Sequence, residues 1–303
     1  MKVDIICPLY EAENYILNLN NSLLKQENVN INKIQYILTK SKDNSEKILK
    51  ENKLDYILID RKEFSHSLTR EKQALKSKAN IIVFISQDIV IENTNYLYNL
   101  VNPIKKGEAD ACYSRQLTKF DNIEKYTREA NYPDKSVIKT KDDIEKLGLK
   151  TFFFSDASSA VNLKVFKNLN GYDGKKLPIN EDMYFAYKLI MNGYKIKYCA
   201  DSICYHSHDF KLKELYDRYK LTGRFFKENS YIDNFGTNKS GGGLAKYILK
   251  RAIKDKNIKL GIKDVNGLIN RVDANYSWST NTGFTSNNKD VTTEVSLIGD
   301  ITY

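Results

Sequence analysis

The chain has 303 residues, of which 41% are hydrophobic, enough for one large domain of roughly 200 to 250 residues with an appendage. The N-terminus enters a strand-like run, KVDIIC, without the apolar region of a signal peptide, and no window approaches the roughly 18 apolar residues of a membrane span. Four cysteines lie in or beside apolar runs without CxxC spacing, which indicates reduced core residues: Cys7, Cys112, Cys199 and Cys204. We therefore expect a cytoplasmic protein that is neither exported nor integral to a membrane.

The charge is basic, with 48 Lys and Arg against 38 acids and a net charge of +10. This bias suits an anionic ligand or an anionic membrane surface. The chain is also rich in Lys, Asn and Ile throughout, so the same charge fits a compositional habit spread over solvated faces. No arginine-rich tract or aromatic-basic motif is present, and nucleic acid is therefore not an expected partner.

In chain order, short apolar runs alternate with helix-like stretches over the first 106 residues. The runs KVDIIC, KIQYIL, DYILID and NIIVFI are followed by predicted helices over residues 13–26, 44–52, 66–78 and 94–106. This alternation predicts a parallel α/β sheet covered on both faces. Ligands of such sheets bind at the carboxyl ends of the strands.

Polar residues follow three of these runs, at 8–11, 39–45 and 86–88. The turn after the first run lacks glycine, and no GxxxxGK[ST] loop exists, so phosphates must be held by a metal or by side chains. Asp88 is a candidate metal ligand. His206 or His208 could complete the metal site from the far end of the domain. Position alone equally allows Asp88 to cap the next helix.

The middle of the chain, residues 116–150, loses the strand pattern and becomes polar, which indicates an insertion over the cleft. Candidates for ligand contact in and beside this segment are Arg115, Gln116, Arg128 and Tyr132, although a surface loop is the preferred interpretation for Arg128. Residues 152–161 then return as a predicted buried strand.

The stretch 180–208 joins an acid pair to a predicted helix and two predicted strands and ends in two histidines. Glu181 and Asp182 lie where the helix should begin, with apolar residues recurring at helical spacing behind them. Carboxylates there can face a cleft and accept a proton, but simple capping explains an isolated acidic pair as well. His206 and His208 would share a face of a regular strand.

After residue 209 the pattern predicts a further helix, and residues 244–263 form a basic amphipathic segment. It could lie on a membrane, but packing against the main domain explains its apolar stripe as well and is the preferred interpretation. From residue 273 onward the chain is rich in Ser, Thr and Asn, and we expect an irregular tail.

Nine segments in order resemble one known family. They are CPLYEAENYI, a Ser-x-Asp-x-Ser loop, FSHSLTREKQA, VFISQD, YSRQL, FFFSDASSAV, LNGYD, INEDMYFAYKLIMNGYKIKY and YHSH. Over about residues 3–230 they resemble glycosyltransferase family 2, most closely its bacterial rhamnosyltransferase-like members. The resemblance implies a GT-A fold, with a Rossmann-like, mostly parallel sheet flanked by helices and a helical C-terminal appendage. The catalytic domain would span 1–230, with a donor half to about 115 and an acceptor half from 116, and 231–303 would be a helical extension and polar tail.

The resemblance also implies a reaction. A nucleotide-diphosphate sugar, dTDP-rhamnose or a UDP-hexose, would donate its sugar with inversion to a growing cell-surface polysaccharide or lipid-linked oligosaccharide, at or near the inner face of the membrane. Asp182 would be the general base and Glu181 would position the acceptor or orient its partner. Mg²⁺ or Mn²⁺ would be bound by Asp88 with His206 or His208. The implied nucleotide-sugar contacts are Pro8, Tyr10, Glu11, Thr39, Ser41, His66, Arg70, Gln87, Arg115 and Asp156.

Three positions depart from the family pattern. Leu38 stands where many members carry an acidic residue that contacts the nucleotide base. The D-x-D motif is reduced to Ser86-Gln87-Asp88, and Asp156 replaces a more usual asparagine. A catalytically degenerate GT-A-fold protein that binds nucleotide sugars or acts as a scaffold is therefore the alternative. A nucleotidyltransferase is not expected, because it should carry a glycine- and arginine-rich loop after the first strand.

Overall fold

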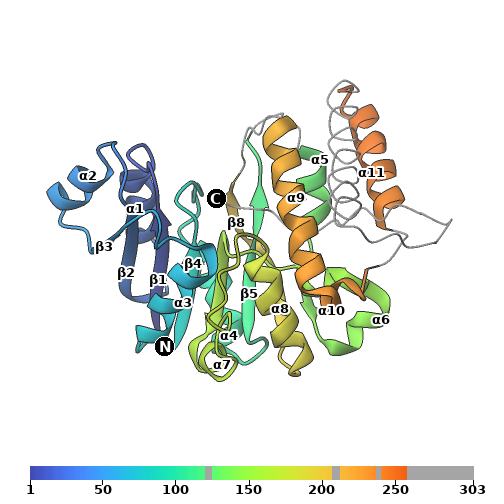
Figure 1. Ribbon diagram of the computed structural model, residues 1–303, viewed down its shortest axis with the longest axis horizontal. Coiled ribbons are helices and arrows are strands. Elements are labelled where there is room, and N and C mark those ends of the chain that lie inside the picture. Colours follow the sequence, from blue (N-terminus) through green and yellow to red (C-terminus); the bar gives the residue numbers. More distant parts are fainter. Residues whose placement is uncertain (120–124, 207–211, 237–239, 258–303) are drawn as a thin grey trace.

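A computed structural model of the chain describes residues 1–119, 125–206, 212–236 and 240–257. An eight-stranded sheet runs through this part in the order β3-β2-β1-β4-β7-β5-β8-β6 (Figure 1). Six strands are parallel to one another: β1 (Lys2–Leu9), β2 (Asn30–Thr39), β3 (Tyr56–Ile59), β4 (Ile81–Ile85), β5 (Ala111–Leu117) and β8 (Ile196–Tyr205). Two run antiparallel, β6 (Val137–Lys139) and β7 (Ser158–Asn162). The predicted mostly parallel α/β sheet is confirmed.

The four helices predicted for the first half are present with slightly shorter bounds. They are α1 (Ile16–Leu24), α2 (Ser45–Glu51), α3 (His66–Lys76) and α4 (Tyr96–Lys105). The second half adds α5 (Lys125–Asn131), α6 (Ile144–Leu147), α7 (Leu163–Asn168), α8 (Glu181–Met191), α9 (Leu212–Glu228), α10 (Ser230–Asp233) and α11 (Ser240–Lys254), with 3₁₀ turns η1 (Lys141–Asp143) and η2 (Gly148–Phe152). The helix predicted to begin at Glu181 does so.

Both faces of the sheet are covered, because alternate residues of each buried strand point to opposite sides. On β4, Ile82 and Phe84 face a core that includes α7, α8 and part of α9, while Ile81 and Val83 face a second core with α1 and α4. The strands are therefore held from both sides, which leaves their ends as the places where loops can form a site.

Three predictions about the second half are corrected. The predicted strand 152–161 is a strand only from Ser158, because the preceding phenylalanines pack in the core instead of joining the sheet: Phe152 contacts the rings of Tyr187 and Phe235 with centroids 5.3 and 5.2 Å apart. The segment 116–150 is not without strands, since β6 pairs with β8. The two strands predicted within 180–208 are one strand, β8.

The C-terminal segment packs on the main domain through α11. Ile248 and Ala252 are buried, and Arg251 Nε lies 2.9 Å from Glu129 Oε2 of α5. The preferred packing interpretation is confirmed for this part, although Leu249 and Ile253 are 41% and 64% exposed. The rest of the amphipathic segment and the predicted tail, 258–303, lie outside the described residues. Within the described residues no helix is both long and apolar enough to cross a membrane.

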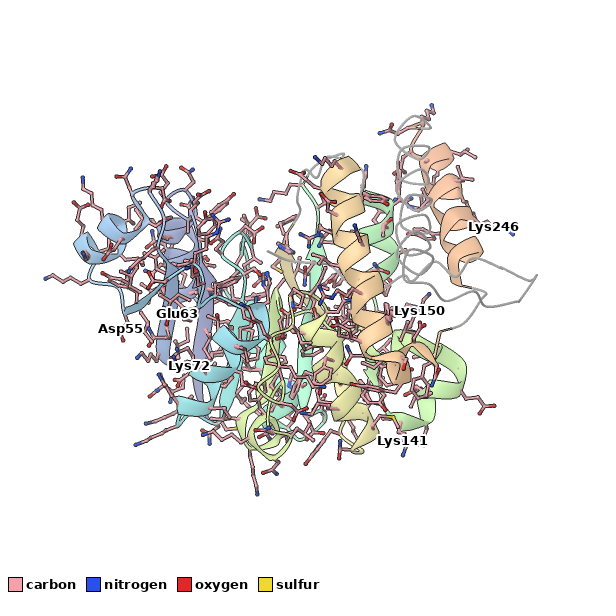
Figure 2. The ribbon with its side chains drawn as sticks, viewed as in Figure 1. Asp55, Glu63, Lys72, Lys141, Lys150 and Lys246 are labelled. Atoms are coloured by element: carbon pink, nitrogen blue, oxygen red, sulfur yellow. The ribbon has the colours of Figure 1, made fainter. Side chains whose placement is uncertain are left out.

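Charged side chains are distributed widely over the surface. Exposed lysines lie on α3 (Lys72), η1 (Lys141) and α11 (Lys246), far apart in Figure 2. This distribution favours a compositional origin of the net charge. The four cysteines are buried and free of disulfides, as predicted.

Candidate active site

The acid pair lies at the amino end of α8, directly after Asn180, whose φ of +57° turns the chain into the helix. Glu181 and Asp182 are only 5% and 6% exposed. Asp182 Oδ1 accepts a hydrogen bond from the Met183 backbone N–H at 2.7 Å. The capping interpretation is wrong for both acids, because Asn180 is the N-cap of α8 and no side-chain cap hydrogen bond forms; Asp182 accepts only from the N–H of the next residue. Such deep burial exceeds what a surface cap requires.

Burial changes the protonation of both acids. It raises the pKa of Asp182 well above its usual range, and the charges of Glu181 and Asp156 raise it further. Burial also raises the pKa of Glu181 to about 7, opposed by Arg70 and reinforced by Asp156. A carboxylate with a raised pKa is a stronger base once it is ionised, so the cluster can accept a proton near neutral pH.

Arg70, on α3, lies beneath the acid pair. Its Nη1 is 3.2 Å from Glu181 Oε1 and donates to the His66 carbonyl at 3.0 Å, and the side chain is 1% exposed. His66 stays neutral, because burial, with the charges of Arg70 and Arg218, lowers its pKa to about 3. The structure thus brings two of the predicted nucleotide-sugar residues together with the acid pair.

Asp156 is also part of this buried cluster. It is 1% exposed, and its two carboxylate oxygens accept hydrogen bonds from Ser159 Oγ at 2.7 Å and Tyr172 Oη at 2.5 Å. Glu71, next to Arg70 on α3, accepts the Tyr172 N–H at 2.6 Å. Neither Glu71 nor Tyr172 was among the predicted site residues. The bond between Glu71 and Tyr172 spans 101 residues and that between Asp156 and Tyr172 spans 16, so helix or strand spacing could not have indicated them.

The predicted metal ligands Asp88 and His206 meet at the ends of β4 and β8. A β-bridge between Val90 and Tyr205, with N···O distances of 2.8 and 2.9 Å, holds the two segments together. His206 Nε2 lies 3.4 Å from Asp88 Oδ2, and His206 Nδ1 lies 2.8 Å from Gln116 Oε1. The alternative that Asp88 caps the next helix is wrong, because Asn95 is the N-cap of α4. His208 lies outside the described residues.

The Asp88–His206 pair has the chemistry and spacing of two ligands of one divalent cation. Carboxylate oxygen and imidazole nitrogen both bind Mn²⁺, and two ligands at right angles about 2.1 Å from an ion are about 3 Å apart. No group of three or more His, Cys, Asp or Glu residues that could hold a metal occurs in the described ranges. The protein side chains described would thus supply a partial set, and donor phosphates and water would supply the rest.

The segment after β1 is held in place by Gln87. Its amide bonds the backbone of Tyr10 in both directions, accepting from the N–H at 2.8 Å and donating to the carbonyl at 2.9 Å. Glu11 follows with φ +49°. Arg61, directly after β3, stacks over the Tyr10 ring with its Cζ 5.3 Å from the centroid. Arg61 was not among the predicted site residues, although its position two residues after the end of β3 was a usable signal.

The remaining predicted contacts lie at the same edge or farther along it. Pro8 pairs with Ile37 in the sheet, Thr39 is 2% exposed at the end of β2, and Ser41 Oγ donates to Asp43 at 2.6 Å. Arg115 Nε donates to the Tyr132 carbonyl at 3.3 Å. The loops after β1 and β2 are tied together by the Ala12 N–H, which donates to Ser45 Oγ at 2.8 Å.

Both clusters lie at the carboxyl edge of the parallel strands. Asp156 comes two residues before β7, whose Ser158 pairs with Ile85 at the end of β4, and Asp88 follows that same end of β4. Arg70, the partner of Glu181, lies in the first half of α3, which follows β3.

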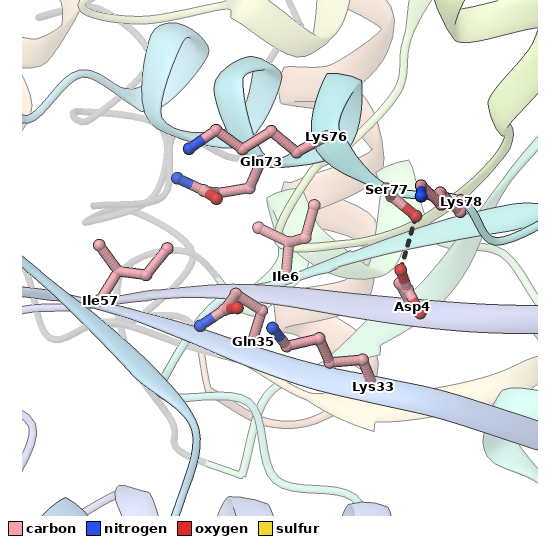
Figure 3. A pocket seen from close by; sticks show the side chains of 9 residues that line it. All are labelled: Asp4, Ile6, Lys33, Gln35, Ile57, Gln73, Lys76, Ser77 and Lys78. Atoms are coloured by element: carbon pink, nitrogen blue, oxygen red, sulfur yellow. Dashed lines mark hydrogen bonds between the residues drawn. The ribbon is translucent and has the colours of Figure 1, made fainter.

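A cavity of about 280 Å³ lies elsewhere, between α3 and the first three strands (Figure 3). Its lining includes Lys33, Gln35, Gln73 and Lys76, and Asp4 there accepts a hydrogen bond from Ser77 Oγ at 2.5 Å. These positions belong to the first half and the middle of β1 and β2 and to the second half of α3. The cavity is therefore separate from the candidate site at the carboxyl ends.

Comparisons with solved structures concern the fold. A mannosyltransferase from Pyrobaculum calidifontis, PcManGT, solved with GDP-Man and Mn²⁺, aligns with a TM-score of 0.51 at 13% identity, over 92% of this chain and 73% of that one. TarS residues 1–349 of S. aureus aligns with a TM-score of 0.50 at 16% identity, over 94% and 93%. At these identities the likeness shows the GT-A fold alone.

Comparisons by sequence are closer. The O-antigen chain rhamnosyltransferase RfbN of Salmonella typhimurium is 32% identical over 241 residues, 78% of this chain and 76% of the relative. WbaN of Salmonella anatum, another O-antigen chain rhamnosyltransferase, is 35% identical over 175 residues, about half of each chain (56% and 55%). The family model for glycosyl transferase family 2 matches residues 4–169. The chain therefore belongs to glycosyl transferase family 2.

Proposed function

We propose that the protein is an inverting, metal-dependent glycosyltransferase of polysaccharide biosynthesis. Its donor would be dTDP-rhamnose, with a UDP-hexose as the second choice, and its acceptor a hydroxyl of a growing cell-surface polysaccharide or lipid-linked oligosaccharide. The observation that carries the proposal is that a buried acid pair and a carboxylate–imidazole pair lie at the same edge of the sheet. The relatives named as O-antigen chain rhamnosyltransferases support rhamnose and a glycan acceptor.

Asp182 is the residue that accepts the proton of the acceptor hydroxyl. Its raised pKa makes the ionised carboxylate basic enough for this step. Attack from the side of Asp182, opposite the leaving nucleotide diphosphate, inverts the anomeric carbon in a single displacement. Glu181, fixed by Arg70 at 3.2 Å, keeps the first turn of α8 in place and contributes the charge that raises the pKa of Asp182.

Asp88 and His206 would hold the divalent cation, Mg²⁺ or Mn²⁺, which supplies charge neutralisation to the leaving diphosphate. The loops after β1 and β2, with Tyr10 and Arg61, would receive the base and ribose. Residues 1–230 would form the catalytic domain and α11 the start of the extension that packs on it. We place the reaction in the cytoplasm, with a peripheral membrane contact through the exposed side of α11 where the acceptor is lipid-linked.

The test is nucleotide release and sugar transfer with dTDP-rhamnose and several UDP-hexoses, with and without EDTA. The wild-type protein should release nucleotide from a single donor, and this release should stop when EDTA removes the metal. Asp182→Asn should abolish transfer and leave donor affinity unchanged, and kcat/KM of the wild type should rise with pH as Asp182 loses its proton. Loss of donor affinity in Asp182→Asn would assign that residue to binding.

The same assay separates the alternative, a degenerate protein that binds nucleotide sugars without transferring them. Leu38 and the single acid of Ser86-Gln87-Asp88 are the features that favour it. Donor binding by calorimetry without turnover of any donor, in the presence of Mn²⁺ and an acceptor glycan, would establish that alternative and refute the enzyme.

A further inference from the structure

A buried chain of hydrogen bonds ends on His206. Arg128 Nη1, on α5, donates to Gln116 Oε1 at 3.3 Å, and Gln116 Nε2 donates to Ser155 Oγ at 2.9 Å. The same Gln116 Oε1 lies 2.8 Å from His206 Nδ1. All four residues are at most 3% exposed. Through Gln116 on β5, His206 is thus connected to Arg128 on α5 and to Ser155 in the segment before β7.

The donors and acceptors of this chain have only one consistent assignment. A guanidinium can only donate, so the Gln116 atom that Arg128 contacts is the amide oxygen. That oxygen can only accept, so His206 Nδ1 must carry the hydrogen of the 2.8 Å bond. In the neutral ring, Nε2 then presents its lone pair, and it does so toward Asp88 Oδ2 at 3.4 Å.

We propose that Gln116 is a positioning residue for the metal site: it holds His206 in the tautomer and ring orientation in which Nε2 can bind a divalent cation together with Asp88. The inference rests on the proposed metal-dependent function. Arg128 and Ser155 act one step further out by fixing which way the Gln116 amide points. Arg128, for which a surface loop was the preferred interpretation, is 3% exposed and belongs to this chain.

The physical reason is that a carboxylate oxygen and an imidazole lone pair repel each other at this distance, unless Nε2 carries a proton or a metal cation lies between them. Without the Gln116 hydrogen bond, the His206 ring could flip or change tautomer and present an N–H to Asp88, which would prevent metal binding. The Gln116 bond prevents both changes. Hydrogen-bond partners that orient a metal-binding histidine in this way typically contribute about 10- to 100-fold to metal affinity.

The first measurement is Mn²⁺ affinity of the full chain by electron paramagnetic resonance, with and without dTDP or UDP. Gln116→Met removes the acceptor and should weaken Mn²⁺ binding about 10- to 100-fold. Gln116→Glu retains an acceptor oxygen toward Nδ1 and should stay within about threefold of wild type. Gln73→Met, a matched change in the cavity on the other side of the domain, should have no effect. Wild-type affinity in Gln116→Met would overturn the proposal.

The second measurement does not depend on metal binding or activity. Long-range ¹H–¹⁵N spectra of the histidine rings report which nitrogen carries the proton, and His206→Asn identifies the His206 signals. Wild type should show the Nδ1–H tautomer, Gln116→Glu should retain it, and Gln116→Met should lose it. An Nε2–H tautomer in wild type would refute the inference. If no sugar nucleotide is turned over but the tautomer result holds, the proposed function fails while the positioning role of Gln116 stands.

Discussion

Replacing Arg70 with methionine would leave Glu181 buried without its ion-pair partner. The two side chains are 1% and 7% exposed, and Nη1 lies 3.2 Å from Oε1. At that separation and an effective dielectric constant of about 20, the attraction is about 5 kcal/mol. Removing one partner of a buried pair typically lowers the free energy of unfolding by about 3–5 kcal/mol. We expect Arg70→Met to lose stability in this range above neutral pH.

The decrease in the free energy of unfolding caused by Arg70→Met should depend on pH, in a direction set by the protonation of Glu181. Its pKa is raised from 4.5 to about 7 in the folded protein, so the folded state keeps this proton to higher pH than the unfolded chain. The stability contributed by the protonated carboxyl is fully present below about pH 4.5 and is lost as the pH rises through about 7. Arg70 lowers that pKa, so its removal raises it further. The deficit of Arg70→Met should therefore be small at pH 5 and large at pH 8.5.

Urea unfolding at pH 5, 7 and 8.5 measures these free energies for wild type, Arg70→Met, Glu181→Gln and the double variant. If the unpaired carboxylate causes the loss, the double variant should recover about 2–3 kcal/mol relative to Arg70→Met at pH 8.5, since the charge is gone. A double variant as unstable as Arg70→Met at every pH would refute the reasoning and assign the loss to the packing of the arginine stem.

Two further predictions concern the fold around the site. Burial lowers the pKa of Lys139 from 10.5 to about 7, so the stability of the wild type should rise between pH 7 and about 10.5, by up to roughly 5 kcal/mol. Lys139→Met should abolish this rise in urea unfolding, and an unchanged pH dependence in that variant would contradict the prediction. Gly171→Ala should destabilise by about 2–4 kcal/mol, because φ is +47° and the new Cβ would lie 2.8 Å from Glu71 Oε1. Gly107→Ala, at φ +72° with open space, should lose only about 1 kcal/mol in thermal unfolding, and equal losses would refute the steric argument.

The sequence predicted most of the sheet because its signal is local. Each buried parallel strand is a short apolar run, and the residues after it, such as Asp88 at the end of β4, fall at the site edge by topology alone. β6 was missed because Val137–Lys139 is only three residues long and its first two residues are exposed. A strand of this size carries no periodicity.

The arrangement of the site residues was less predictable, because their partners are distant in the chain. Arg70 was assigned to the nucleotide by resemblance, whereas its contact at 3.2 Å is with Glu181, 111 residues later. Its role toward the nucleotide stays a prediction. Gln116 was considered only for substrate contact, and its bond to His206 spans 90 residues. Spacing along the chain cannot show which of several buried polar groups will pair.

The bridge between Val90 and Tyr205 has a consequence for how the site tolerates change. Asp88 lies two residues before Val90, and His206 lies one residue after Tyr205. The register of the bridge, not the length of the chain between the two segments, therefore sets the separation of the two side chains. Insertions between β5 and β7 that preserve the bridge should leave the 3.4 Å pair intact. A slip of one residue along β8 would turn His206 to the opposite face of the sheet and separate it from Asp88.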